Sequence, residues 1–120
     1  MVAKTRKAKL QKGQRLQKWV CEKISNLLGI PWGVDEQIAS RESGQSGVDI
    51  RLVASAKKRL KLSIECKNQE HWNIHRWIEQ AKTNQAKGTD WLVIAKRNHK
   101  DPVVILDANA FFKILEKVRL

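Results

Sequence analysis

Two carboxylates and one lysine have the types and spacing needed for metal-assisted chemistry. Asp49 lies near the start of a short strand-like segment, and Glu65 lies near the end of the next one. If the two segments pair antiparallel, these ends are adjacent and the two carboxylates can share a divalent cation. Lys67 follows Glu65 by two positions, so strand alternation places both on one face. Two hard oxygen ligands for Mg²⁺ beside a cation are suited to phosphodiester hydrolysis.

The segments that carry these residues read as strands. Residues 47–53 and 60–67 are short β-type runs, and the polar, basic connection at 55–59 predicts a hairpin between them. A weaker strand is expected at 37–41, followed by a turn-rich link at 42–47.

Helical periodicity appears in three other segments. Apolar residues recur at helical spacing over 10–28, and Gly29 is suited to cap that helix. A second helix is expected over 73–87, before Gly88, and a last helix after Asp107, which is a good N-cap.

Two further strands complete the predicted fold. The continuous apolar run 91–95 is typical of a strand buried on both faces, and 103–106 follows as a final strand. The order αβββαββα predicts an α/β domain of three layers, with a mixed central β-sheet flanked by helices. The strand at 91–95 is expected to run parallel to the Glu65 strand through a right-handed crossover.

Length and charge limit the domain organisation and the class of partner. A chain of 120 residues forms one domain, expected at 10–120 after a flexible basic arm at 1–9. The 24 Lys and Arg against 12 Asp and Glu give a net charge of +12. A solubility role or attraction to a membrane surface would also explain this charge. However, the density of basic residues over 4–18 is more typical of an arm that binds nucleic acid.

Neither a membrane span nor a secretion signal is expected. No apolar stretch approaches the roughly 20 residues that cross a bilayer, and the basic N-terminus has no apolar signal core. A cytoplasmic protein is therefore expected. Cys21 and Cys66 are expected to be buried free thiols in a reducing compartment. A disulfide between them is an alternative that the sequence leaves open.

The residues around the two carboxylates resemble a known signature. Gly47-Val48-Asp49-Ile50 followed by Ile64-Glu65-Cys66-Lys67 resembles the Asp…Glu-x-Lys motif of the PD-(D/E)xK nuclease superfamily. Lys12-Gly13 is similar to the start of the first helix in Holliday junction resolvases of the archaeal type, and residues 63–70 are similar to small phage endonucleases. The resemblance spans about residues 12 to 107. It implies a restriction-endonuclease-like core.

The resemblance also implies roles for individual residues. Asp49 and Glu65 would bind Mg²⁺, or Mn²⁺, together with the backbone carbonyl of Cys66. Lys67 would stabilise the charge that develops on the phosphorane or position the attacking water. Gln80 is similar in placement to a helix glutamine that reaches the active site in some of these nucleases. It reads equally well as an exposed helix residue.

Gln17 is the main departure from the resolvase pattern. Resolvases that resemble this chain carry a metal-binding glutamate at the corresponding position of the first helix. An amide oxygen can coordinate Mg²⁺ directly or through water, but it adds no charge, so one metal ion rather than two is an open alternative. Glu42 is the expected spare carboxylate.

Basic and hydroxyl side chains of the N-terminal segment and of the stretch before Asp49 are the candidates for contacts with DNA. They are Lys4, Arg6, Lys7, Lys9, Lys12, Arg15, Ser40, Arg41 and Ser43. Trp72, beside the end of the Glu65 strand, is expected to touch DNA or a second subunit. His71 and His75 have a helical zinc spacing but no convincing third ligand.

These observations predict a metal-dependent DNA endonuclease of phage or prokaryotic type that cuts branched DNA, as a Holliday junction resolvase does. Two symmetric cuts in a junction imply a homodimer with a two-fold axis. A restriction-like, nicking or repair nuclease is the alternative within the enzyme class. A non-catalytic basic nucleic-acid-binding protein is the alternative outside it.

Overall fold

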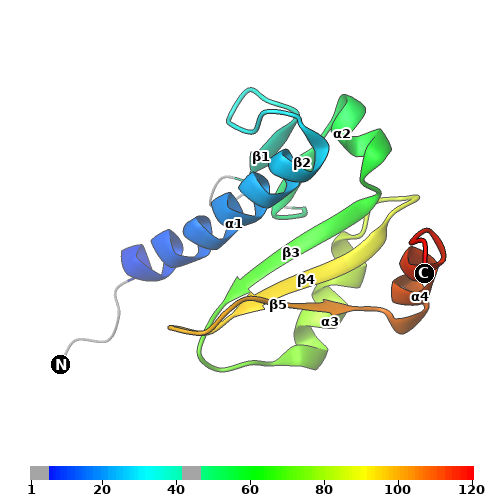
Figure 1. Cartoon of the computed structure of the whole chain (residues 1–120). Coiled ribbons are helices and arrows are strands. Elements are labelled where there is room, and N and C mark those ends of the chain that lie inside the picture. The colour runs from blue at the N-terminus through cyan, green and yellow to red at the C-terminus, as the bar shows by residue number, and fades with distance from the viewer. Residues whose placement is uncertain (1–5, 42–46) are drawn as a thin grey trace.

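The computed structural model describes residues 6–41 and 47–120 of the chain (Figure 1). Helices and strands alternate along most of the sequence. The elements are α1 (Arg6–Leu28), β1 (Ile38–Ser40), β2 (Ile50–Leu52), α2 (Ala54–Arg59), β3 (Leu62–Asn68), α3 (Ile74–Asn84), β4 (Asp90–Lys96), β5 (Val103–Leu106) and α4 (Ala108–Glu116). Among these residues, no helix has both the length and the apolar character that a bilayer crossing requires.

A mixed three-stranded sheet in the order β3-β4-β5 forms the centre of the molecule. β3 and β4 run parallel with Ile64 opposite Leu92, and β4 and β5 run antiparallel with Val93 opposite Ile105. The predicted parallel pairing of these two strands is therefore confirmed. A helix, α3, makes the connection between them, as parallel pairing requires.

Strand β4 is covered on both faces, as its continuous apolar sequence predicts. Leu92 and Ile94 belong to a core cluster with the buried side of α1, whereas Val93 and Ala95 belong to a second cluster with Trp77 of α3. The two helices therefore cover opposite faces of the sheet. This is the expected three-layer α/β arrangement, and it is compatible with a restriction-endonuclease-like core.

The predicted hairpin between the Asp49 and Glu65 segments is wrong. β2 pairs antiparallel with β1 in a separate two-stranded sheet, and α2 occupies the expected connection. The sequence of α2 explains the difference, because alanine and lysine favour a helix and Ala56 is fully buried in the core. The Gln37 amide oxygen accepts a hydrogen bond from the Ala56 N–H at 3.0 Å.

The two sheets still meet at the start of β2. The Asp49 N–H donates to the carbonyl of Ile64 at 3.1 Å, which places Asp49 beside the middle of β3. α1 packs across both sheets and buries Leu16, Val20 and Ile24 against them. The order of elements is thus αββαβαββα, with one helix more than predicted.

Helix α1 begins earlier than expected. Residues 6–9, predicted to belong to a flexible arm, form its first turns, because their lysine, arginine and alanine side chains are good helix formers. The rest of the predicted arm, including Lys4, lies outside the described residues. The predicted end of the helix is confirmed: Gly29 has φ +68° and its N–H donates to the Ser25 carbonyl at 2.8 Å.

Helix α3 is shorter than expected and ends at Asn84, whereas the sequence suggested residue 87. The Ala86 N–H donates to Ser63 Oγ of β3 at 2.9 Å, so the chain leaves the helix to bind the sheet. Asn73 caps the first turn by accepting from the Arg76 N–H at 3.2 Å. The predicted cap of the last helix is also confirmed, since Asp107 accepts from the Ala110 N–H at 3.1 Å.

Candidate active site

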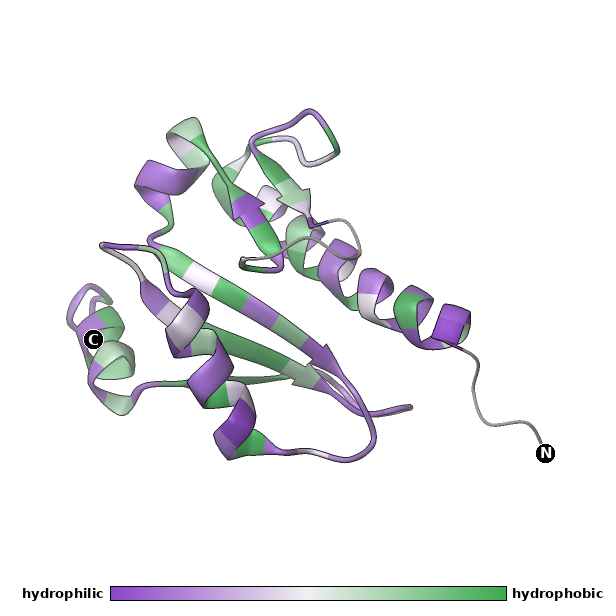
Figure 2. Ribbon diagram, turned by 180° about the vertical axis from the view of Figure 1, so that it is seen from behind, coloured by the Kyte–Doolittle hydropathy of each residue, from purple (hydrophilic) through white to green (hydrophobic). Residues whose placement is uncertain are grey.

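A pocket of about 660 Å³ opens where α1, the start of β2, the end of β3 and α3 come together. All five residues that the sequence suggests for catalysis line it: Gln17, Asp49, Glu65, Lys67 and Gln80. Figure 2 shows hydrophilic residues at the arrowhead end of β3 and at several turns of α1 and α3.

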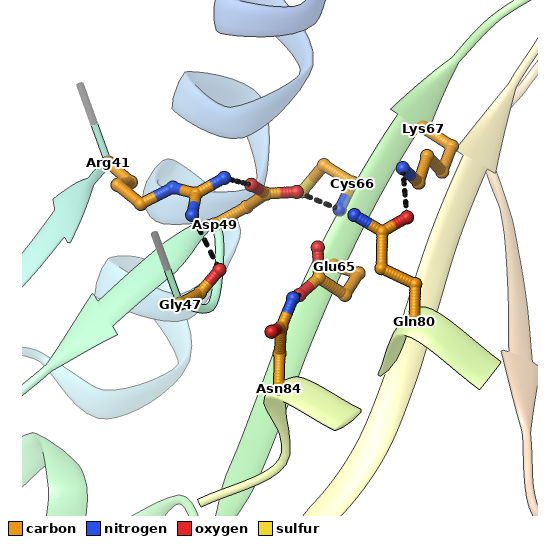
Figure 3. A network of polar contacts seen from close by, with 8 residues as sticks. All are labelled: Arg41, Gly47, Asp49, Glu65, Cys66, Lys67, Gln80 and Asn84. Carbon is orange, nitrogen blue, oxygen red and sulfur yellow. Dashed lines mark hydrogen bonds and ion pairs between the residues drawn. The ribbon is translucent and has the colours of Figure 1, made fainter. Parts of the chain in front are cut away.

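Asp49 is buried and both of its carboxylate oxygens are engaged (Figure 3). Oδ1 accepts a hydrogen bond from Arg41 Nη2 at 2.7 Å, and Oδ2 accepts one from the backbone N–H of Cys66, also at 2.7 Å. The second contact fixes the carboxylate beside β3 without any hairpin. Arg41, predicted to contact DNA, also donates to the Gly47 carbonyl at 2.6 Å, so this guanidinium is held inside the site.

Glu65 and Lys67 both face α3, as the alternation of β3 predicts. Asn84 Nδ2 donates to Glu65 Oε1 at 2.9 Å, and Lys67 Nζ donates to Gln80 Oε1 at 2.6 Å. Asn84 was missed from the sequence. Its position four residues after Gln80, on the same helical face, was the available signal.

Glu65 is only 1% exposed, and its surroundings favour the protonated form. Burial, followed by the negative charge of Asp49, raises the pKa of Glu65 to about 7, while Asn84 and Lys67 act in the opposite direction. Two carboxylates therefore lie close together, and Glu65 is hydrogen-bonded to an amide rather than to a cation. A divalent cation bound between them would stabilise the charged form of both.

Gln17 offers a further acceptor at the same pocket. Its amide oxygen is buried, and no described residue donates a hydrogen bond to it. A buried acceptor without a donor is uncommon in proteins. In this position the Gln17 amide oxygen can act as a neutral ligand of a hard cation, together with the two carboxylates. Among residues 6–41 and 47–120, no group of three His, Cys, Asp or Glu side chains gathers to bind a metal.

The Cys66 thiol does not extend this ligand set. Burial raises the pKa of the Cys66 thiol well above its ordinary value, and burial raises that of Cys21 to about 11, so both thiols stay protonated at neutral pH. Both cysteines are free, which confirms the expectation of reduced thiols. The backbone carbonyl of Cys66 remains the group predicted to bind metal.

The basic residues suggested for DNA contacts are divided among several places. Lys9 and Lys12 line the pocket, and a second pocket of about 590 Å³ continues from Lys12 past Arg15 to Lys96. Arg6 and Lys7 are exposed on the first turn of α1. Two suggested residues, Ser43 and the spare carboxylate Glu42, lie outside the described residues, as Lys4 does.

Two other suggested residues have packing roles in the structure. Ser40 lies in β1 opposite Ile50 of β2 and is half-buried. Trp72 is also half-buried: its indole N–H donates to the Gln69 carbonyl at 2.9 Å, and its ring lies 5.7 Å from that of Trp77. Trp72 thus closes the α3 side of the sheet, and its predicted contact with DNA or a second subunit stays a prediction.

Comparison with known proteins agrees with this geometry. Residues 8–119 match a family model described as phage putative PDDEXK endonuclease. The chain therefore belongs to this family of phage PD-(D/E)xK endonucleases. The searches of curated proteins and of solved structures gave no match. Membership makes the protein a nuclease, which implies DNA as substrate, and PD-(D/E)xK nucleases generally use divalent metal ions.

The raised pKa of Glu65 predicts an unusual dependence of stability on pH in the metal-free protein. The pKa rises from 4.5 to about 7 on folding, so the folded chain takes up a proton between these values. The stability from this proton is fully present below pH 4.5 and is lost as the pH rises through about 7. Its size is about 3 kcal/mol.

Urea unfolding in EDTA at pH 5 and pH 8 measures this effect. We expect Glu65→Gln to resemble the unmodified chain at pH 5 and to be more stable at pH 8. Glu79→Gln, at an exposed carboxylate of α3, is the control and should change neither value. Equal stability of Glu65→Gln and the unmodified chain at pH 8 would contradict the assignment of the shift to Glu65.

Proposed function

We propose that this endonuclease is metal-dependent, uses Mg²⁺ or Mn²⁺, and hydrolyses phosphodiesters in branched DNA such as a four-way junction. The observation that carries the metal dependence is the meeting of Asp49 and Glu65 in one pocket, where burial and then the charge of Asp49 raise the pKa of Glu65. The Gln17 amide oxygen, which no described residue satisfies, supports the same conclusion.

The ligands proposed for the metal come from three elements. Asp49 and Glu65 supply negative charge, the Cys66 carbonyl supplies a backbone oxygen, and Gln17 supplies the amide oxygen from α1. The hydrogen bond from the Cys66 N–H keeps Asp49 in place, because a carboxylate oxygen can accept one such bond and still bind a cation. When bound, a divalent metal polarises the scissile phosphate and lowers the pKa of the attacking water.

Lys67 is proposed to act on the phosphate itself. Its ammonium is held at 2.6 Å from Gln80 Oε1, so Gln80 is a positioning residue that aims the charge into the pocket. In the reaction, a bond forms between the water oxygen and phosphorus, and one phosphorus–oxygen ester bond breaks. One DNA end keeps the phosphate, and the other takes up a proton as a hydroxyl. Lys67 stabilises the negative charge that develops on the phosphate in the transition state.

The preference for branched DNA is proposed from the charge of the chain. The net charge of +12 favours contacts with the phosphate backbone, and such contacts recognise shape rather than sequence.

Substitution of the three central residues tests the reaction. We expect Asp49→Asn, Glu65→Gln and Lys67→Ala each to slow cleavage by about 10²-fold or more, because each removes charge that binds the metal or the transition state. DNA binding should change little, since affinity comes mainly from phosphate contacts. Asp35→Asn, at an exposed carboxylate, is the matched control.

Cleavage of supercoiled plasmid, of a linear duplex and of a synthetic four-way junction, each with and without Mg²⁺, provides the measurement. Retained cleavage by Glu65→Gln would refute the active-site assignment. Equal rates on linear duplex and junction would leave the nuclease intact but refute the proposed preference for branched DNA.

Gln17 supplies a graded test of the metal site. Gln17→Glu adds a negative charge, so the Mg²⁺ concentration for half-maximal cleavage should fall, roughly tenfold for a gain of about 1.4 kcal/mol in metal binding. Gln17→Leu should raise that concentration. Gln11→Glu makes the same charge change at an exposed position of α1 and serves as the control. Identical midpoints for all three variants would place Gln17 outside the metal site.

The second pocket suggests the path of a DNA strand away from the cleavage site. It shares Lys12 with the first pocket and adds the side chains of Arg15, Trp19 and Lys96. Arg15→Gln should therefore lower the slope of log affinity against log salt by about 1, the value for one lost phosphate contact. Fluorescence anisotropy in EDTA measures this without cleavage. Lys113→Gln, on α4, should leave the slope unchanged, and an equal effect of both variants would contradict this path.

A further inference from the structure

The C-terminal part of the chain leaves large apolar side chains in solvent. Thirteen large hydrophobic residues are exposed among the described residues, and seven of them fall within residues 103–120. We use "C-terminal face" for the exposed side chains of β5 and α4. These are Val103, Val104, Phe111, Phe112 and Ile114.

Helix α4 has an apolar stripe but buries almost none of it. Phe111, Ile114 and Leu115 have the spacing of a helix face that normally packs on a core, yet Phe111 is 46% exposed and Ile114 is 43% exposed. Only Ala110 of this helix is buried. Several large apolar side chains left in solvent on one short helix are typical of an interaction site rather than of chance exposure.

Strand β5, which precedes α4 in the chain, leaves two further apolar side chains in solvent. It is the outer strand of the β3-β4-β5 sheet, and none of the described residues pairs with its free edge. Val103 and Val104 flank that edge and are 45% and 58% exposed. An apolar edge strand with unpaired N–H and C=O groups is a template for another strand.

The distribution of charge indicates what kind of partner fits. Residues 101–120 contain three acidic and three basic side chains, so the whole net charge of +12 resides in the first hundred residues. A neutral apolar surface has no electrostatic attraction for DNA or for an anionic membrane. Two copies of so basic a chain repel one another elsewhere on their surfaces, but the C-terminal face lets them meet without that penalty.

We propose that a second copy of this chain docks on the C-terminal face about a two-fold axis. The surface is suited to contact itself, as a two-fold interface requires, because an antiparallel edge can pair with its own copy. Each half-exposed apolar side chain leaves on the order of 100 Å² to bury, so the five side chains supply about 500 Å², more than half of the roughly 800 Å² per partner of a standard interface.

The location of the face fits this partner. Figures 1 and 2 show α4 at the side of the molecule away from α1, which forms a wall of the catalytic pocket. Two copies joined through α4 and the adjoining end of β5 therefore leave the catalytic pocket and α1 of each copy open to substrate. The proposal concerns self-association without DNA and does not depend on the proposed function.

Sedimentation equilibrium of the full chain without DNA tests the proposal. We expect a mass near twice the 13.8 kDa of one chain. Phe112→Gln, at a side chain 62% exposed, should weaken the dimer by roughly 30-fold or more, as expected for a central aromatic contact. Leu27→Gln removes an equally exposed leucine from α1, 71% exposed, and should leave the mass unchanged.

Circular dichroism of the variants verifies that they remain folded, and Val104→Gln provides a second, independent change on the β5 edge. An unmodified chain that stays monomeric at about 100 μM overturns the proposal and leaves the face for a different protein. A dimer that Leu27→Gln weakens as much as Phe112→Gln, or one that both Phe112→Gln and Val104→Gln leave intact, also overturns it.

Discussion

The hydrogen bond from the Cys66 N–H to Asp49 Oδ2 is the interaction on which the candidate site depends. Asp49 immediately precedes β2 of the β1–β2 sheet, whereas Glu65 and Lys67 belong to β3 of the other sheet. Among residues 6–41 and 47–120, no strand ladder joins the two sheets. The 2.7 Å contact and the bond from the Asp49 N–H to Ile64 thus determine how the acidic residues meet.

The arrangement places local stability in conflict with function. A buried carboxylate is costly unless it is paired, and Glu65 has a neutral amide as its hydrogen-bond partner while the ammonium of Lys67 is directed to Gln80. Arg41 pairs with Asp49 and relieves part of the cost. The repulsion that remains between the two buried carboxylates is what a bound cation would relieve, so the destabilising feature and the useful one are the same.

The sequence predicted the parts of the fold that depend on local patterns. The apolar run of β4 implied burial on both faces, and Gly29 and Asp107 marked helix ends that the structure confirms. The pocket also brings together the five suggested catalytic residues. The split of the sheet could not be predicted, because burial of Ala56 and its bond to Gln37 favour a helix over a hairpin. Asn84 could be found only from its spacing of four residues after Gln80, and no sequence pattern indicates that Arg41 pairs with Asp49 rather than with DNA.

The boundary between the β1–β2 sheet and the β3-β4-β5 sheet, here called the seam, has a mechanical consequence. An ion bound by Asp49 on one side and Glu65 on the other would act as a cross-link between two separately hydrogen-bonded units. Such a bridge exists only in the folded chain, so its binding energy adds to the resistance of the seam to opening. The metal ion needed for the reaction would then also keep the two sheets in a fixed position relative to each other.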